Sequence, residues 1–166
     1  RIAQQVQHRE AGEFKKDKLK VLAELTKLRQ ICCDPHLHYA DYKAGSAKLD
    51  TCMELVHGAL DGGHRILLFS QFTGMLDIIG KRLAKEDIAF LKLTGASSKE
   101  SRAKMVAQFQ AGEVPVFLIS LKAGGVGLNL TAADVVIHYD PWWNVAAQDQ
   151  ATDRAHRIGQ QHTVTV

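Results

Sequence analysis

Four short apolar runs, separated by helix-like segments, constrain the fold of this chain more than any other feature. The runs are RILLFS at 65–70, IAFLKL at 88–93, PVFLIS at 115–120 and DVVIHY at 134–139. A short apolar run between turn residues is typical of a parallel strand that is buried on both faces. Helical patterns over 73–86 and from Ser97 or Ser98 to about Phe109 separate the runs, so their order predicts βαβ units with right-handed crossovers. We therefore expect an α/β fold in which helices flank a parallel β-sheet.

Helical patterns also precede and follow this alternation. Residues 1–31 have Leu19, Leu22, Leu25 and Leu28 at a spacing of three, and Asp34-Pro35 ends the pattern. A second helix is expected over 47–60 with Ser46 as its N-cap, and a last one over 145–157 with Asn144 as N-cap and Gly159 just past its end. The final TVTV opens a fifth strand. We expect a helical extension and linker at 1–46, followed by the α/β lobe at 47–166.

Composition excludes some classes of protein and leaves others open. The chain has 166 residues, of which 46% are hydrophobic and 23% are charged, as in a folded soluble protein. No apolar run approaches the roughly 18 residues that a membrane-spanning helix needs. The net charge of +3 permits an anionic partner without requiring one. The chain begins without Met and ends on a strand-like run, so we interpret it as a piece of a longer protein.

The three cysteines, Cys32, Cys33 and Cys52, form a poor disulfide framework, because their number is odd and two are adjacent. This usage indicates a reducing compartment. His36 and His38 follow the pair closely, which raises the question of zinc. The pair lacks C-x-x-C spacing, however, and buried cysteines often serve as small apolar residues. We therefore predict no metal site.

The segments that follow the four strands are polar, Gly-rich or aromatic. They are SQFTG, TGASS, SLKAGGVGLN and DPWWN, in chain order. In an open parallel sheet, ligands bind beyond the carboxyl ends of the strands. We expect one ligand-binding edge made of these segments.

Residues 148–160, QDQATDRAHRIGQ, place two guanidinium groups close together. On a continuous helix, Gln150, Asp153, Arg154 and Arg157 would share one face. Arginine suits bidentate recognition of phosphate, and Asp153 is placed to orient one of the two. A solvated face with local salt bridges fits the same spacing, and the residues alone leave both readings open.

Two further segments carry weaker signals. KAGGVGLN at 122–129 is Gly-rich, but no G-x-x-x-x-G-K-[ST] occurs in the chain, so a tight turn is its default interpretation. Of Trp142 and Trp143, one is expected in the core, and the other could stack or wedge against nucleic acid.

Taken in order, these segments resemble a known family. SLKAGGVGLNL, HYDPWWN and QATDRAHRIGQ are similar to motifs in the C-terminal motor lobe of the Swi/Snf-like ATPases of helicase superfamily two. LLFSQFTGMLDII, LTGASSKESRAKMVAQF and LRQICCDPHL followed by SAKLDTCMEL resemble earlier segments of that lobe, so the likeness covers nearly the whole chain. The resemblance implies a RecA-like lobe, one of two in a complete motor. ATP and Mg²⁺ would be bound mainly by the first lobe, which would explain the missing phosphate loop.

The resemblance also implies roles for individual residues. Arg154 and Arg157 would be arginine fingers, supported by Gln150 and Asp153, while Gly125, Gly127 and Asn129 would line the nucleotide cleft. Double-stranded DNA would be the track, and the matching DNA-facing residues are Ser70, Gln71, Thr94, Gly95, Arg102, Lys122, Trp143 and Asn144. Thr94 stands where an acid is common in the family, and Val145 replaces a frequent Pro.

Partners implied by the resemblance are the first lobe of the same polypeptide, double-stranded DNA and a DNA-bound protein substrate. We expect the isolated lobe to hydrolyse no ATP, and we expect a bacterial cytoplasmic protein, or a nuclear one if the source is eukaryotic. Two alternatives stay open: a lobe of an RNA-directed helicase of the same superfamily, and a non-catalytic Rossmann-like nucleotide- or protein-binding module.

Overall fold

The computed structural model describes residues 11–123, 128–140, 145–156, 160 and 162–166. The chain divides into two compact units, residues 1–44 and 45–166, and each is considered by itself. Within the described residues, no helix has both the length and the apolar character needed to cross a membrane.

The first unit is built on one long helix. Helix α2 spans Ala11–Cys33, and a 3₁₀ turn, η1, follows at Pro35–Leu37. Asp34 caps that turn by accepting a hydrogen bond from the His36 backbone N–H at 2.8 Å. The four leucines at a spacing of three are all exposed, from 42% at Leu25 to 66% at Leu19. Residues three apart drift by about 60° per step around an α-helix, so these leucines spread over the helix surface instead of forming a narrow stripe.

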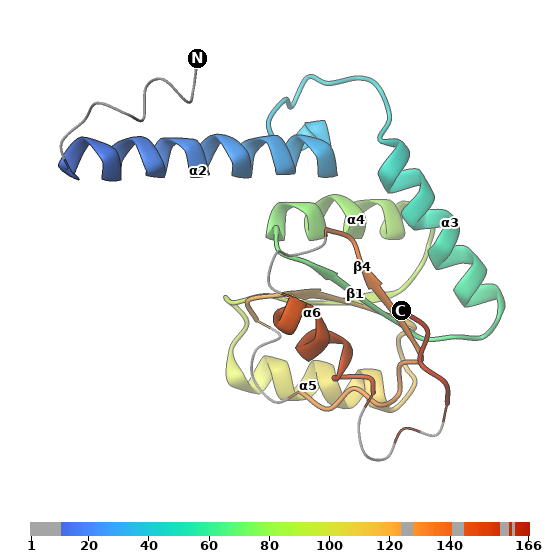
Figure 1. The fold of residues 1–166 in the computed structure, drawn as a ribbon. Helices are drawn as coiled ribbons and strands as arrows, with labels where there is room; N and C mark the ends of the chain where they lie inside the picture. The colour runs from blue at the N-terminus through green and yellow to red at the C-terminus, as the bar shows by residue number, and fades with distance from the viewer. Residues whose placement is uncertain (1–10, 124–127, 141–144, 157–159, 161) are drawn as a thin grey trace. The chain divides into compact units, whose positions relative to one another are not determined.

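The second unit contains a parallel sheet of four strands (Figure 1). The strands are β1 (Ile66–Ser70), β2 (Phe90–Leu93), β3 (Val116–Ser120) and β4 (Val135–His138), in the order β2-β3-β1-β4. Strand β1 is central, since it pairs in parallel with both β3 and β4. Beyond β4, Thr165 makes a single parallel bridge to Val135. The expected parallel α/β sheet is confirmed, and the fifth strand is present only as this bridge.

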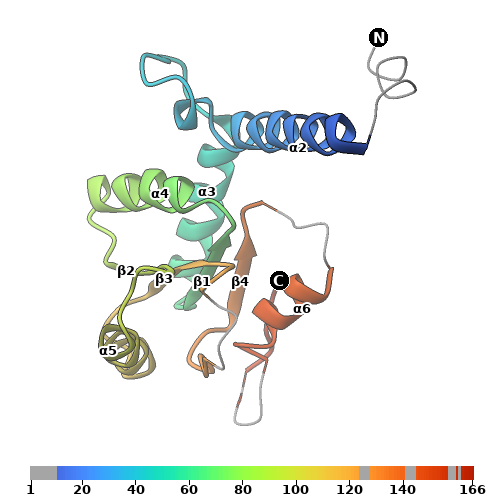
Figure 2. The ribbon, with the colours of Figure 1, turned by 90° about the vertical axis from the view of Figure 1, so that its left-hand side faces the viewer.

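Helices cover both faces of the sheet. Figures 1 and 2 show α3 (Ala47–Asp61) and α4 (Thr73–Lys85) on one face, and α5 (Lys99–Gln110) and α6 (Val145–Thr152) on the other. The predicted caps are found, because Ser46 Oγ accepts from the Leu49 N–H and Ser98 Oγ accepts from the Ser101 N–H. These short-range signals explain why the helix starts were predictable from the sequence.

The core has a layer on each face of the sheet. On one face, α4 contributes four fully buried side chains, Met75, Leu76, Ile79 and Leu83. The other layer lies between the sheet and helix α5. Phe69, Phe117 and Phe109 are fully buried there, and the rings of Phe109 and Phe117 are 5.4 Å apart. Ala151 and Ala155 of the α6 region belong to the same apolar cluster. Burial of this kind contributes about 25 cal/mol per Å² of apolar surface, so the cluster fixes α5 and the α6 region against the sheet.

The last helix differs from the prediction. It was expected to run to Arg157, but α6 ends at Thr152. The Arg154 N–H donates to the Ala151 carbonyl at 3.2 Å and the Ala155 N–H to the Thr152 carbonyl at 3.0 Å, so the chain tightens into i,i−3 turns. Arg154 in turn uses its own carbonyl to accept from the Leu130 N–H at 3.0 Å. This long-range bond takes the carbonyl that a longer helix would have used.

As a result, Gln150, Asp153 and Arg154 do not share the face of one continuous helix. The predicted cap Asn144 and the predicted helix residue Arg157 lie outside the described residues.

Candidate functional site

The carboxyl ends of the strands meet at one edge of the second unit, as the parallel pairing requires. The same edge therefore holds the described site residues that end or follow β1, β2 and β3, namely Ser70, Gln71, Thr94, Gly95 and Lys122. Of the predicted site residues, Gly125, Gly127, Trp143, Asn144 and Arg157 lie outside the described residues. The rest are placed as follows.

Ser70 and Gln71 lie where β1 ends. Ser70 is fully buried, and its Oγ accepts a hydrogen bond from the Phe72 N–H at 3.1 Å. The buried Asp140, which follows β4, joins this loop, since its Oδ2 accepts from the Gln71 N–H at 3.0 Å. Burial raises the pKa of Asp140, while the hydrogen bonds from Ser70 and Gln71 oppose that rise. Ser70 thus organises this loop from within and presents no exposed hydroxyl.

Thr94 and Gly95 begin the loop between β2 and α5. The Thr94 N–H donates to Ser97 Oγ and the Ser97 N–H returns a bond to the Thr94 carbonyl, both at 3.1 Å. Gly95 is exposed, and a Cβ built at this position would meet nothing within 4 Å. The loop is therefore held tightly at its ends while Gly95 offers backbone to solvent.

Arg102, on the first turn of α5, contacts two of these loops at once. Its Nε donates to the Ser97 carbonyl at 3.1 Å and its Nη2 to the Thr94 carbonyl at 3.3 Å. Its Nη1 donates to the Ala123 carbonyl, 3.3 Å away, in the segment that follows β3. Lys122, one residue earlier in that segment, is exposed. The family resemblance assigned both Arg102 and Lys122 to the DNA-binding surface. In the structure Lys122 is exposed, whereas Arg102 is partly buried.

Arg154 is buried, with 5% of its surface exposed, in the turn after α6. Gln160 fixes the same turn: its side-chain Nε2 lies 3.1 Å from the Ala155 carbonyl, 3.1 Å from that of Thr131 and 2.7 Å from that of Ala133. This role of Gln160 was missed by sequence reasoning. A signal was available in the sequence. Gln160 lies at the end of the motif that carries both arginines, and its amide can bond several carbonyl groups.

The exposed members of the predicted nucleotide side are Asn129, Gln150 and Asp153. Asn129 directly precedes Leu130, whose N–H bonds the Arg154 carbonyl. The structure therefore brings Asn129 beside the Arg154 turn, although the arginine itself is not on an exposed helix.

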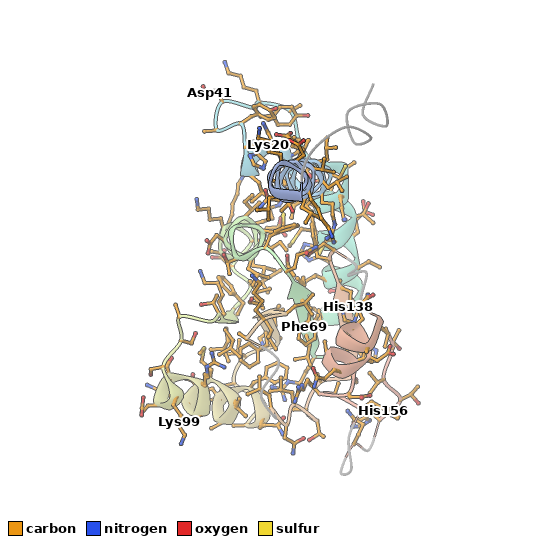
Figure 3. All side chains as sticks on the ribbon, turned by 60° about the vertical axis from the view of Figure 1, so that its left-hand side comes forward. Lys20, Asp41, Phe69, Lys99, His138 and His156 are labelled. Carbon is orange, nitrogen blue, oxygen red and sulfur yellow. The ribbon has the colours of Figure 1, made fainter. Side chains whose placement is uncertain are left out.

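His138, at the end of β4, is a second residue that sequence reasoning missed. Its ring stacks on Phe69 with centroids 5.6 Å apart, and Figure 3 shows the two side by side. His138 Nε2 lies 3.0 Å from the Thr152 hydroxyl at the end of α6. Burial lowers the pKa of His138, and the carboxylates of Asp140 and Asp149 oppose that effect. The neutral ring thus connects β1, β4 and the helix that leads to Arg154.

In the described part of the chain, no group of three or more His, Cys, Asp or Glu side chains is placed to hold a metal ion. None of the three cysteines forms a disulfide, and burial raises the pKa of Cys52 to about 11.

Comparison with known proteins agrees with this geometry. The sequence model of the helicase conserved C-terminal domain matches residues 47–159. An uncharacterized ATP-dependent helicase of Mycoplasma pneumoniae is 42% identical over 152 residues, which cover 91% of this chain and 15% of the relative. The putative ATP-dependent helicase/translocase YwqA of Bacillus subtilis is 44% identical over 154 residues, covering 88% of this chain and 16% of the relative. The chromatin-remodeling ATPase INO80 of Aspergillus oryzae is 47% identical over 122 residues, covering 73% of this chain and 8% of the relative. The chain thus spans a small part of the length of these relatives.

Solved structures place the fold in the same group. The Sulfolobus solfataricus SWI2/SNF2 ATPase core in complex with double-stranded DNA is 39% identical with a TM-score of 0.77, covering 91% of this chain and 32% of that chain. The C-terminal domain of the Sulfolobus ATPase gives a TM-score of 0.73 at 35% identity, covering 87% of this chain and 64% of that chain. The described sheet, with its helices on both faces, is the RecA-like architecture expected of such a lobe. The chain belongs to the helicase conserved C-terminal domain family and is a Swi/Snf-like lobe of helicase superfamily two.

Proposed function

We propose that this chain is the second motor lobe of an ATP-dependent translocase on double-stranded DNA. Its relatives are ATP-dependent helicases and remodelling ATPases, and one similar core was solved on duplex DNA. The observation that carries the proposal is the Arg154 turn. Leu130 and Gln160 hold this turn against the segment that precedes β4, directly beside Asn129.

On the nucleotide side, Arg154 and Arg157 would supply positive charge to a triphosphate held by another lobe. Gln150 and Asp153 would support the arginines, and Gly125, Gly127 and Asn129 would line the cleft. The residues present fit half of such a site, because they offer guanidinium and amide donors for phosphate oxygens but lack a carboxylate cluster among the described positions. ATP and its Mg²⁺ supply the phosphoryl group and neutralise its charge, and both would be held mainly by the first lobe.

On the DNA side, the exposed Lys122, Gly95 and the backbone of the Thr94 loop would meet phosphates. Gln71, Trp143 and Asn144 belong to the same predicted surface. Ser70 would act from within its loop, since its hydroxyl is buried. Contacts of this type are largely independent of base sequence and sensitive to salt.

The test is substitution of each arginine in the full-length protein. Arg157→Ala or Arg154→Ala should lower ATP turnover on the order of 10³-fold, because removal of an arginine finger takes charge from the transition state. ATP binding should largely survive, since the first lobe makes most of those contacts. Near-normal turnover of Arg157→Ala would remove it from this role.

The control is Lys104→Ala, which removes one exposed cation from helix α5 away from the turn. It should leave turnover close to that of the unsubstituted protein. Duplex DNA and duplex RNA should be compared as activators in the same assay. Stronger stimulation by RNA would contradict the assignment of DNA as the track.

A further inference from the structure

We propose that Arg102 is a positioning residue that couples the loop between β2 and α5 to the segment after β3. This inference rests on the proposed function, in which the first loop meets DNA and the segment after β3 leads to the nucleotide cleft. Arg102 would then act mainly through its fork of hydrogen bonds and not as a phosphate contact.

The backbone of Arg102 is held by hydrogen bonds of the helix, independently of its side-chain contacts. Arg102 is the fourth residue of α5, and its N–H donates to the Ser98 carbonyl at 2.9 Å. Ser98 caps the same helix by accepting from the Ser101 N–H at 3.1 Å. The guanidinium therefore projects from a rigid helical turn.

Two of the guanidinium bonds stabilise the loop before α5. Nε reaches the carbonyl of Ser97 and Nη2 that of Thr94, at 3.1 and 3.3 Å. The Thr94 carbonyl also accepts from the Ser97 N–H, so Arg102 reinforces a bond that already closes the turn. Loss of the fork would loosen both ends of the loop around the exposed Gly95.

The third bond crosses to the other segment. Nη1 lies 3.3 Å from the carbonyl of Ala123, which is buried and whose N–H donates to the Ser120 carbonyl at 2.8 Å. Ser120 ends β3, and Ala123 is the last described residue before Gly124. A displacement of either segment must therefore move or break bonds to the same guanidinium.

Only arginine can satisfy this arrangement. Its planar fork offers five N–H donors in fixed directions, whereas a lysine ammonium places its three donors at one point. A simple phosphate contact would depend on the charge of residue 102, which lysine keeps. Positioning depends on the fork, which lysine lacks, so Arg102→Lys separates the two roles.

The first measurement is ATP turnover of the full-length protein against duplex DNA concentration. Arg102→Lys and Arg102→Ala should both lower the maximal rate at saturating DNA by roughly 10- to 100-fold, the scale of small misplacements in a site. Lys104→Ala, the matched loss of charge on the same helix, should leave the maximal rate unchanged. An Arg102→Lys variant with the normal maximal rate and only a higher DNA requirement would overturn the proposal.

The second measurement is hydrogen exchange in the same full-length variants, which does not depend on ATP turnover. Arg102→Lys should increase exchange in both the 94–97 loop and the 121–123 segment, while Lys104→Ala should change neither. An increase confined to one segment, or to none, overturns the coupling even if the motor proves active. Absence of DNA-stimulated turnover in the unsubstituted protein would refute the proposed function instead, and the exchange result would still decide the role of Arg102.

Discussion

His138 shows how one buried ring can join three elements at the candidate site. It stacks on Phe69 of β1, belongs to β4, and lies 3.0 Å from the Thr152 hydroxyl of α6. The Thr152 carbonyl in turn accepts from the N–H groups of Ala155 and His156, which flank the turn of Arg154. Replacing His138 should therefore alter the Arg154 turn indirectly, through Thr152.

The free energy of unfolding should depend on pH through the protonation of the His138 ring. Burial lowers the pKa of His138 in the folded protein below its value near 6.5 in the unfolded chain. The unfolded state therefore binds a proton first as pH falls, so the stabilisation is complete above about pH 6.5 and declines as pH drops toward the folded pKa. His138→Phe, which keeps the stack on Phe69, should lose this decline in urea unfolding measured between about pH 7.5 and 5.

The control for this prediction is Thr152→Val, which removes the partner hydroxyl but leaves the imidazole. It should cost about 0.5–1.5 kcal/mol, the net value of one hydrogen bond, and keep the decline with pH. An unchanged decline in His138→Phe would show that groups other than His138 govern this pH range.

At the residue scale, a side chain's role could be predicted when its partner is close in the sequence, and could not be predicted when its partner is distant. Ser46 and Ser98 were identified as caps because each bonds an N–H three residues away. The partners of Arg102 and Gln160 could not be predicted, because these side chains bond carbonyls of loops up to 29 residues distant. The residue types permitted several roles, and only the fold selects among them.

At the scale of elements, two helical glycines have opposite surroundings. Gly80 in α4 faces strand β2, and a Cβ there would lie 2.9 Å from Phe90 Cζ. Gly58 in α3 faces open space, with nothing within 4 Å of the added carbon. Helix α4 therefore approaches the sheet more closely at Gly80 than a larger residue would allow.

Paired alanine substitutions test this close approach. Gly58→Ala should stabilise the protein by roughly 0.5–1 kcal/mol, because alanine is the better helix former. Gly80→Ala should destabilise it by about 1–3 kcal/mol, since the methyl group must displace the Phe90 ring. Equal effects of the two substitutions on the urea midpoint would contradict the described packing of α4 on β2.

The elements themselves were largely predictable, with one instructive exception. Strands β1 and β3 are buried along their whole length, which is why their apolar runs stood out in the sequence. Helix α6 ended five residues early, where the chain tightens at Arg154 and the Leu130 N–H bonds the Arg154 carbonyl. No local pattern announces such a bond, since its partners come from separate segments.

At the scale of the whole molecule, the ordered motifs identified the family where composition could not. A net charge of +3 is compatible with many partners, whereas three motifs in fixed order match one kind of lobe. The match, over residues 47–159, covers most of the second unit and every predicted site residue. The DNA contacts and arginine roles stay predictions, because they depend on groups that this chain does not contain.

Because the proposed ATP site needs a second lobe, we predict that the isolated chain is inactive. It should hydrolyse no ATP with or without duplex DNA, because in the proposed function it would supply only the arginine side of a shared site. Phosphate release by the purified chain, with folding checked by cooperative thermal unfolding, is the measurement. DNA-stimulated turnover by the chain alone would contradict the proposal that a second lobe completes the site.

The bond between Leu130 and Arg154 has a consequence for how chain length can vary in this family. It closes a ring of polypeptide that includes β4 and α6, so the length of that ring sets where the guanidinium-bearing turn stands. An inserted or deleted residue inside the ring shifts the turn, whereas one in the Gly112 bend between α5 and β3 does not. Natural insertions and deletions should therefore be tolerated at that bend and selected against inside the ring.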